Sequence, residues 1–144
     1  MAPSVKTFRA LHEQDHAFVI PNPWDIGSAR ILAGLGFDAL ATTSGGMAYA
    51  LGKRDGKISR SEALEHCRYI VAATPLPVSA DLENGFGDTP EQMFDIITEA
   101  AETGLAGCSI EDYSGNPTSP IYDQSMAVER ICAASEACQH LSTD

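Results

Sequence analysis

The chain has 144 residues, of which 44% are hydrophobic and 20% charged, a composition typical of a globular domain. Nine Lys and Arg residues stand against 20 Asp and Glu residues, so the formal net charge is −11. An acidic chain repels phosphate backbones, which argues against nucleic-acid binding. Gly, Pro or charged residues interrupt every apolar stretch before the ~20 residues of a membrane span, and no apolar signal segment opens the chain. We therefore expect a cytoplasmic protein with a single domain over residues 1–144.

The first strand–helix unit follows a short leading helix, which we expect over residues 4–11. The apolar run 17–20 predicts a strand that two prolines end. A helical pattern then covers residues 24–35 and stops near Gly36. A strand followed directly by a helix is the repeating unit of parallel sheets.

The second unit has a clear helix start. A strand is expected over residues 37–42, and a loop rich in Gly and charge follows it. The next helix begins near Ser59, because Ser59 and Glu62 have the spacing of a capping box. Its apolar positions lie on one face: Leu64, Cys67, Ile70 and Val71.

The third unit begins with a strand over residues 77–80. Asp88 or Thr89 is the expected cap of the following helix, and Pro90 suits its first turn. The inward face of that helix has helical spacing: Met93, Ile96, Ile97 and Ala100.

The fourth unit begins with the apolar run 105–112, and a loop of Pro, Gly and Ser residues follows it. A last helix is expected over residues 123–141. Its expected buried stripe is Met126, Ile131, Ala134 and Cys138.

Strand–helix alternation repeated four times predicts an α/β fold with a parallel sheet flanked by helices. Two architectures fit: a small open parallel sheet, or the N-terminal half of an eight-stranded β/α barrel. No GxGxxG fingerprint opens the first helix, which weakens the nucleotide-binding version of the open sheet.

The four cysteines follow no CxxC spacing, and we expect them to be buried, reduced thiols. No histidine stands at the short spacing from another ligand that a zinc site needs.

Polar residues follow every predicted strand, and the ends of parallel strands meet at one edge of the sheet. Asp81 and Glu83 are two residues apart and point to the same side of an extended strand end. Asp55 and Glu111 would complete a group of four carboxylates. Crowded carboxylates ionise together only when a cation neutralises them, and oxygen ligands suit Mg²⁺ or Mn²⁺. The spacing alone leaves open whether Asp81 and Glu83 are ligands or turn and cap residues.

A second candidate site is the run Ser44, Gly45 and Gly46 after the second strand. Glycine permits close backbone approach, and the amides of such a segment can bind a carboxylate. A flexible loop of no further function fits the same residues.

The blocks NPWDIGSARILAGLGFDALATTSGG, LGKRDG, PVSADLENGFGD and GCSIEDYSG resemble the isocitrate lyase/phosphoenolpyruvate mutase superfamily. The resemblance covers nearly the whole chain, in the right order and with matching distances. It implies a β/α-barrel enzyme that binds Mg²⁺ (or Mn²⁺) and a small 2-oxo or hydroxy acid. Members cleave or rearrange a bond next to a pyruvate-type enolate, and full-length members are typically homotetramers. The resemblance therefore implies a homo-oligomer.

The same resemblance implies roles for the candidate residues. Asp81 would bind the metal directly and contact the substrate, while three other carboxylates would hold the waters of the metal: Asp55, Glu83 and Glu111. The substrate carboxylate would lie against Ser44, Gly45 and Gly46. The catalytic base remains unassigned.

Two departures from the family pattern limit this interpretation. The stretch after the fourth strand, YSGNPTSPIYD, carries neither the K-[KR]-C-G-H sequence of isocitrate-type lyases nor the lysine of the mutase gating loop. Cys108 lies within the strand and does not replace the lyase cysteine. The chain also stops where strand five would begin, so we expect a partial barrel of about four β/α units in a truncated chain.

Three functions therefore compete. The first is a Mg²⁺-dependent carbon–carbon lyase, or a related enolpyruvate-forming enzyme, acting on a small oxo or hydroxy acid. The second is a non-catalytic remnant that keeps the metal and carboxylate pocket. The third is a flavodoxin-like regulatory or nucleotide-binding domain, which only the strand–helix alternation favours.

Overall fold

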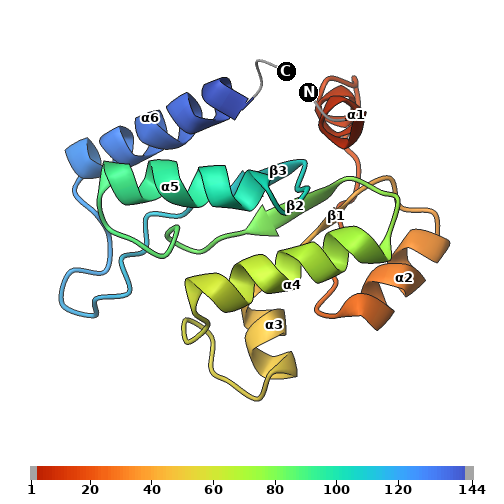
Figure 1. The fold of residues 1–144 in the computed structure, drawn as a ribbon, viewed down its shortest axis with the longest axis horizontal. Helices are drawn as coiled ribbons and strands as arrows, with labels where there is room; N and C mark the ends of the chain where they lie inside the picture. Colours follow the sequence, from red (N-terminus) through yellow and green to blue (C-terminus); the bar gives the residue numbers. More distant parts are fainter. Residues whose placement is uncertain (1–2, 142–144) are drawn as a thin grey trace.

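A three-stranded parallel sheet in the order β1-β2-β3 runs through the computed structural model, which describes residues 3–141 (Figure 1). The strands are β1 (Leu40–Ala41), β2 (Val78–Asp81) and β3 (Gly107–Ser109). Leu40 pairs with Val78 across β1 and β2, and Ser79 pairs with Gly107 across β2 and β3. The carboxyl ends of all three strands therefore lie at one edge of the sheet.

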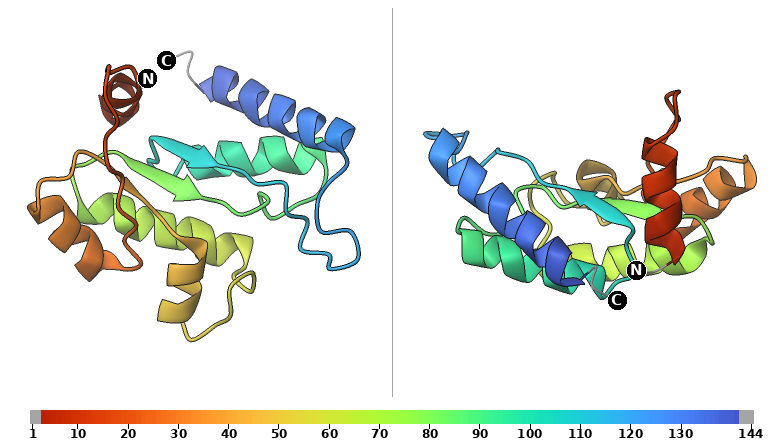
Figure 2. Two further views of the ribbon diagram at one scale, coloured as in Figure 1. Left: turned by 180° about the vertical axis from the view of Figure 1, so that it is seen from behind. Right: turned by 90° about the horizontal axis from the view of Figure 1, so that it is seen from above.

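Six helices accompany the strands within residues 3–141, and the helices α4 and α5 lie on one face of the sheet (Figure 2). The six helices are α1 (Pro3–His12), α2 (Ile26–Gly34), α3 (Ser44–Ala50), α4 (Arg60–Ala73), α5 (Pro90–Ala101) and α6 (Gln124–Leu141). Figure 2 shows α4 and α5 on the same side of the strands, and Figure 1 shows α6 packed along α5. This is the arrangement of consecutive β/α units, as the sequence predicts.

Local hydrogen bonds fix where three helices begin. Asp25, Ser59 and Thr89 are the N-caps of α2, α4 and α5, and each takes part in a capping box. In α4 the backbone N–H of Ser59 donates to Glu62 Oε2 over 2.9 Å. These bonds satisfy backbone donors that the first turn of a helix leaves free. Because the capping residues are three positions apart, the start of such a helix can be predicted from the sequence. The predicted caps of α4 and α5 are confirmed.

The core lies between the sheet and the helices on its covered face. Along β2, Val78 and Ala80 are buried toward the helices, whereas Ser79 and Asp81 are half-buried on the opposite face. Residues of α4, α5 and α6 complete the main cluster: Leu64, Cys67, Met93, Ile96, Ile97, Ala100, Ala134 and Ala137. The predicted inward face of α5 is confirmed.

The leading helix α1 lies over the other face of the sheet, at the amino end of β3. A Cβ built on Gly107 would lie 3.0 Å from the ring of Phe8 and 3.6 Å from Ser79 Oγ. The ring of Phe8 also packs edge-on against His12, with centroids 4.5 Å apart. Helix α1 therefore covers the Ser79 face of the sheet near the amino end of β3.

The prediction of a first strand over residues 17–20 is wrong. This segment runs beside β1, but its only bonds to β1 among the described residues come from its end: Ala41 N–H donates to Pro21 O over 3.1 Å, and Asn22 Nδ2 donates to Ala41 O over 3.1 Å. Pro21 and Pro23 have no N–H to continue a ladder. Three strands therefore pair within residues 3–141, where the sequence predicts four.

The predicted buried stripe of α6 is wrong in part. Ala134 is buried, but Ile131 is 47% exposed and Cys138 is exposed. Arg130, with 1% of its surface exposed, lies at the centre of the buried face instead.

The expectation of four buried thiols is wrong. Cys67 is buried, but Cys108 is only partly buried and Cys132 is exposed, like Cys138. No disulfide forms among the four cysteines within residues 3–141.

Candidate functional site

Asp81 ends β2 and is held from three sides. Its Oδ2 accepts hydrogen bonds from the Ser44 backbone N–H (2.9 Å) and from Ser44 Oγ (2.7 Å), and its Oδ1 accepts one from the Glu83 N–H (3.1 Å). Its own N–H donates to Oγ1 of the buried Thr42 over 3.0 Å. The structure thus joins the ends of β1 and β2 through Asp81, as the convergence of parallel strands predicts.

Glu83 lies two residues beyond Asp81 in an unfavourable electrostatic environment. Burial raises the pKa of its carboxyl, and the charges of Asp55, Asp81 and Glu111 raise it further. Its Oε1 is buried without a hydrogen-bond partner among the described residues. Its backbone has a φ of 50°, in the left-handed region that non-glycine residues rarely adopt. A buried oxygen without a donor is costly and marks a place where a cation or its water would be stabilising.

Asp55 and Glu111 approach the same region from two other loops. A Cβ built on Gly45 would lie 3.4 Å from the carboxyl carbon of Asp55, so this carboxylate lies directly beside Gly45. The Glu111 N–H donates to Glu83 O over 2.9 Å. Burial raises the pKa of the Glu111 carboxyl, and Asp81 and Asp55 raise it further. The four predicted carboxylates are therefore close enough to affect one another.

Within residues 3–141, no three His, Cys, Asp or Glu side chains are already gathered as a set of metal ligands. The four carboxylates nevertheless fit a hard divalent cation on two observations. Burial and the charges of the neighbouring carboxylates raise the pKa values of Glu83 and Glu111, and Glu83 Oε1 has no donor among the described residues. Oxygen donors of this kind suit Mg²⁺ or Mn²⁺, with water filling the other positions.

The segment Ser44, Gly45 and Gly46 is helical, so the interpretation of these residues as a flexible loop is wrong. It forms the first turn of α3, with Thr43 as the N-cap accepting a 3.2 Å hydrogen bond from the Gly46 N–H. The Ser44 N–H and hydroxyl both donate to Asp81. The segment thus lies beside the carboxylates, but two of its donors already have an acceptor within the protein.

Gly46 is required by close packing. A Cβ at this position would lie 2.6 Å from Thr43 Cγ2 and 3.1 Å from Trp24 Cβ. We expect Gly46→Ala to lower the free energy of unfolding by about 1–3 kcal/mol, as overpacking does elsewhere. Gly34→Ala is the control, because a Cβ at Gly34 in α2 meets nothing within 4 Å and alanine favours helix. Urea unfolding of both variants checks this, and equal effects would contradict it.

The raised pKa of Glu83 predicts how stability depends on pH. The folded chain holds the proton of Glu83 more tightly than the unfolded chain, so stability falls as pH rises above the ordinary glutamate value of 4.5. In metal-free buffer we expect Glu83→Gln to melt at a higher temperature than the original chain at pH 7. The difference should vanish near pH 4.

Glu91→Gln is the matched control, with the opposite sign. A hydrogen bond from its own backbone amide lowers the pKa of the Glu91 carboxyl, so this group stabilises the fold above its ordinary pKa. We therefore expect the glutamine variant to melt lower at pH 7. Melting curves from pH 4 to 8 would contradict this account if both variants shifted in the same direction.

The remaining polar residues at the predicted strand ends have structural roles. Asn22 Nδ2 donates to Ala41 O, and Asp25 caps α2 by accepting a 2.6 Å hydrogen bond from the Ser28 N–H. That bond lowers the pKa of the Asp25 carboxyl. The carbonyl oxygen of Trp24, a residue that is 52% exposed, accepts a 3.0 Å hydrogen bond from His66 Nε2 in the tautomer that carries a proton there.

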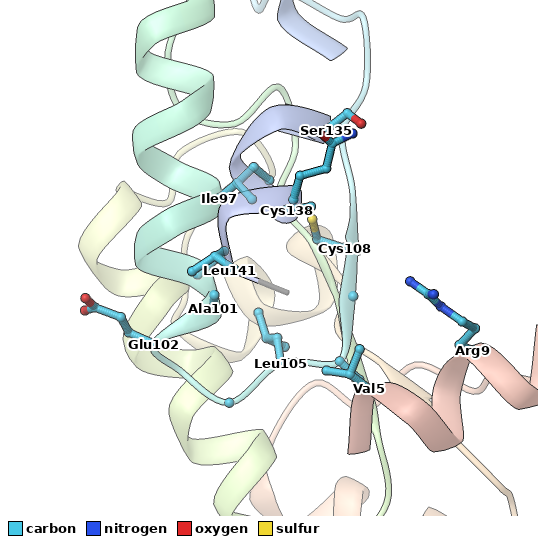
Figure 3. A pocket seen from close by; sticks show the side chains of 15 residues that line it. Val5, Arg9, Ile97, Ala101, Glu102, Leu105, Cys108, Ser135, Cys138 and Leu141 are labelled. Atoms are coloured by element: carbon cyan, nitrogen blue, oxygen red, sulfur yellow. The ribbon is translucent and has the colours of Figure 1, made fainter. Parts of the chain in front are cut away.

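A cavity of about 650 Å³ lies at the amino end of β3, away from the carboxylates (Figure 3). Its wall is mainly apolar and comes from α1, α5, α6 and β3; Ile97, Leu105, Cys108 and Leu141 are among the lining residues. Burial raises the pKa of the Cys108 thiol to about 11, so this thiol is protonated at neutral pH. The charged residues of its lining are Arg9 and Glu102.

Sequence reasoning missed one part of the site. Arg130 of α6 donates to backbone carbonyls of the turn that carries Glu83, and it packs against the ring of Tyr122. The only sequence signal is an arginine on the otherwise apolar face of a helix.

No helix in the part of the chain that the structure describes is long and apolar enough to span a membrane.

The family model described as phosphoenolpyruvate phosphomutase matches residues 8–144. An uncharacterised protein of Mycobacterium tuberculosis is 35% identical over 129 residues, which are 88% of this chain and 47% of that protein. This chain thus spans about half the length of the curated relatives it matches.

Solved structures show the same relation. A Burkholderia cenocepacia protein of unestablished lyase or mutase activity is 52% identical, with a TM-score of 0.95 over 98% of this chain and 50% of that one. A 2,3-dimethylmalate lyase of the phosphoenolpyruvate mutase/isocitrate lyase superfamily is 29% identical, with a TM-score of 0.88 over 98% and 50%. A phosphonopyruvate hydrolase solved with oxalate and Mg²⁺, only 20% identical, shares the fold with a TM-score of 0.88 over 94% and 48%. The expected half of a β/α barrel is confirmed.

Proposed function

This chain belongs to the phosphoenolpyruvate mutase/isocitrate lyase superfamily, and from that premise we propose that it forms the metal-binding part of a lyase for small 2-oxo or hydroxy acids. The observation that carries the proposal is the convergence of four carboxylates at the strand ends, with a buried Glu83 oxygen that has no donor within residues 3–141. A structural role as turn and cap residues would not require this repulsive arrangement.

The residues divide into two groups by what they would bind. We propose that Asp81 binds Mg²⁺ directly and that three carboxylates accept hydrogen bonds from its waters: Asp55, Glu83 and Glu111. When bound, the cation stabilises negative charge that develops on a 2-oxo oxygen as an enolate forms. Ser44, Gly45 and Gly46 would orient the substrate carboxylate, which requires the Ser44 donors to be shared with Asp81.

The reaction follows from the same arrangement. A 2,3-dimethylmalate lyase has this fold, and a carbon–carbon cleavage that releases pyruvate is the reaction class that we propose for the complete site. A pyruvate-releasing lyase can be followed continuously by coupling pyruvate reduction to the oxidation of NADH.

A non-catalytic binding protein is the second candidate, because a specific observation favours it. The segment after β3, closed by a bridge between Tyr113 and Ile121, contains no Lys, Cys or His that could act as an acid or base. Such a protein would bind metal and acid without turnover.

One assay with three substrates separates the two candidates. Oxaloacetate, 2,3-dimethylmalate and 2-methylisocitrate, the acids named in the relatives' activities, are supplied with Mg²⁺, and pyruvate release is measured. Pyruvate release that Asp81→Asn abolishes supports the lyase. Oxalate binding by calorimetry without release of pyruvate supports the binding protein, and neither binding nor turnover contradicts both.

The assembly state is part of the proposal. Strands β1 and β3 lie at the edges of the sheet, and an edge strand offers unpaired backbone groups to another chain. We propose a homo-oligomer in the cytoplasm, and sedimentation equilibrium measures its mass.

A further inference from the structure

Arg130 is a buried cation outside the carboxylate cluster. It is 1% exposed and takes part in none of the ion pairs found within residues 3–141. Its Nη1 donates to Gly87 O over 2.5 Å, and its Nη2 donates to Asn84 O. Burial of a charge is costly unless hydrogen bonds compensate it. The compensation here comes from two carbonyls of one short turn, residues 83–88.

This turn has an unusual backbone. Glu83 has a φ of 50°, Gly85 of 80° and Phe86 of 56°, so three of its residues lie in the left-handed region. Two of them are not glycine, and that conformation persists only where surrounding contacts hold it. Local bonds contribute, from the Gly85 N–H to Leu82 O (2.7 Å) and from the Phe86 N–H to Asn84 Oδ1. From outside the turn, Arg130 donates to one carbonyl near the start of the turn and to another near its end.

Tyr122 holds the same turn through its side chain. The guanidinium of Arg130 lies 4.1 Å from the centre of the Tyr122 ring. The Tyr122 hydroxyl donates to Asp88 Oδ1 over 2.5 Å and accepts from Asn84 Nδ2 over 2.9 Å. An arginine over an aromatic face is attracted to the ring and oriented by it. Together these contacts link α6, and the Tyr122 side chain two residues before its start, to the turn after β2.

We propose that Arg130 and Tyr122 are positioning residues that hold turn 83–88 in the conformation in which Glu83 joins the other carboxylates. The proposal deepens the proposed function and rests on it for the role of Glu83 toward the cation. Neither side chain touches the cluster, so their effect is transmitted through the backbone of the turn.

Two measurements test the proposal in parallel. The first is hydrogen–deuterium exchange of the metal-free chain, which reports the turn itself. The second is the dissociation constant for Mn²⁺, from electron paramagnetic resonance of the free ion. In Arg130→Lys, which keeps the charge and loses the planar pair of donors, we expect exchange in peptides covering residues 82–88 to be at least fivefold faster. Peptides of α4 and the first turns of α5 should be unchanged.

The Mn²⁺ affinity of Arg130→Lys should fall about tenfold, as when other groups that orient metal ligands are removed. Tyr122→Phe keeps the ring beside Arg130 and loses only the hydroxyl bonds, so its effects should have the same pattern and be smaller. Arg60→Lys is the matched control, because Arg60 pairs with Glu99 on α5 and makes no bond to the turn. It should change neither measurement.

The outcomes separate this proposal from the proposed function. If Arg130→Lys leaves exchange in the turn unchanged, or speeds it without weakening Mn²⁺ binding, the positioning role is overturned. If the substituted chain loses protection throughout, Tyr122→Phe decides by the same two criteria. If the unsubstituted chain binds no Mn²⁺, the proposed function fails, and the exchange result alone decides whether Arg130 holds the turn.

Discussion

Asp81→Asn is expected to weaken Mn²⁺ binding by at least about a hundredfold, the largest effect of any single substitution on this site. Asparagine has nearly the same shape and can still accept from the Ser44 hydroxyl and amide, so the ends of β1 and β2 should remain joined. What is lost is the carboxylate charge that a divalent cation requires of a direct ligand. Titration of Mn²⁺ followed by electron paramagnetic resonance measures the change.

Asp112→Asn is the control for net charge. Asp112 is exposed at the same end of the sheet, and the substitution alters the formal charge of −11 by the same single unit. We expect its Mn²⁺ affinity to stay within about twofold of the original, because exposed charges are screened by solvent and salt. Equal losses in the two variants would mean that the acidic surface attracts the ion without a defined site.

Ile96→Ala is expected to cause the largest loss of stability, about 2–5 kcal/mol of the free energy of unfolding. Ile96 is fully buried in α5, in the cluster that joins α4, β2, α5 and α6. A Cβ built on Gly85 would lie 3.4 Å from its Cγ2, so Ile96 also supports the turn that carries Glu83. The loss combines the removed apolar contacts with the cavity that they leave.

Ile31→Ala provides the same chemical change on a surface. Ile31 of α2 is 66% exposed, and its replacement should alter the free energy of unfolding by no more than about 0.5 kcal/mol. Urea denaturation, with the slopes compared as well as the midpoints, measures both. A loss in Ile31→Ala as large as that in Ile96→Ala would show that the core of residues 3–141 does not determine the stability of the chain.

Those parts of the fold that depend on neighbours in the sequence were predictable. The Ser59–Glu62 capping box and the Thr89 cap are fixed by bonds between residues three apart, and the buried face of α5 follows from its helical spacing. The polar residues after β2 could also be placed at the site, because strand direction decides where they converge. These features need no knowledge of distant contacts.

Helix α3 could not be predicted because two glycines in its first turn disfavour helix by about 1 kcal/mol each. Its stability comes from contacts elsewhere in the chain: Met47 and Ala48 are buried with Ile58 and Ala63. The segment 17–20 shows the reverse case. Its β-branched, apolar residues favour a strand, but Pro21 and Pro23 remove the donors that would extend the pairing.

Arg130 is the clearest example of what the sequence leaves undetermined. An arginine in the middle of a helix is normally exposed, so the periodicity assigned Ile131 to the core in its place. The two carbonyls that compensate the buried guanidinium belong to residues 84 and 87, more than 40 positions earlier in the chain. Only the three-dimensional structure brings this donor and these acceptors together.

The central claim is that the carboxylates at the strand ends form a native site for a divalent cation and a small acid within this chain. A thermal melt followed by circular dichroism, without ligand, with Mg²⁺, and with Mg²⁺ plus oxalate as a mimic of enolpyruvate, tests it most directly. Only ligands that bind the folded state raise the midpoint. We predict a cooperative melt whose midpoint rises with Mg²⁺ and rises further with oxalate. A broad melt that neither ligand shifts would contradict the claim.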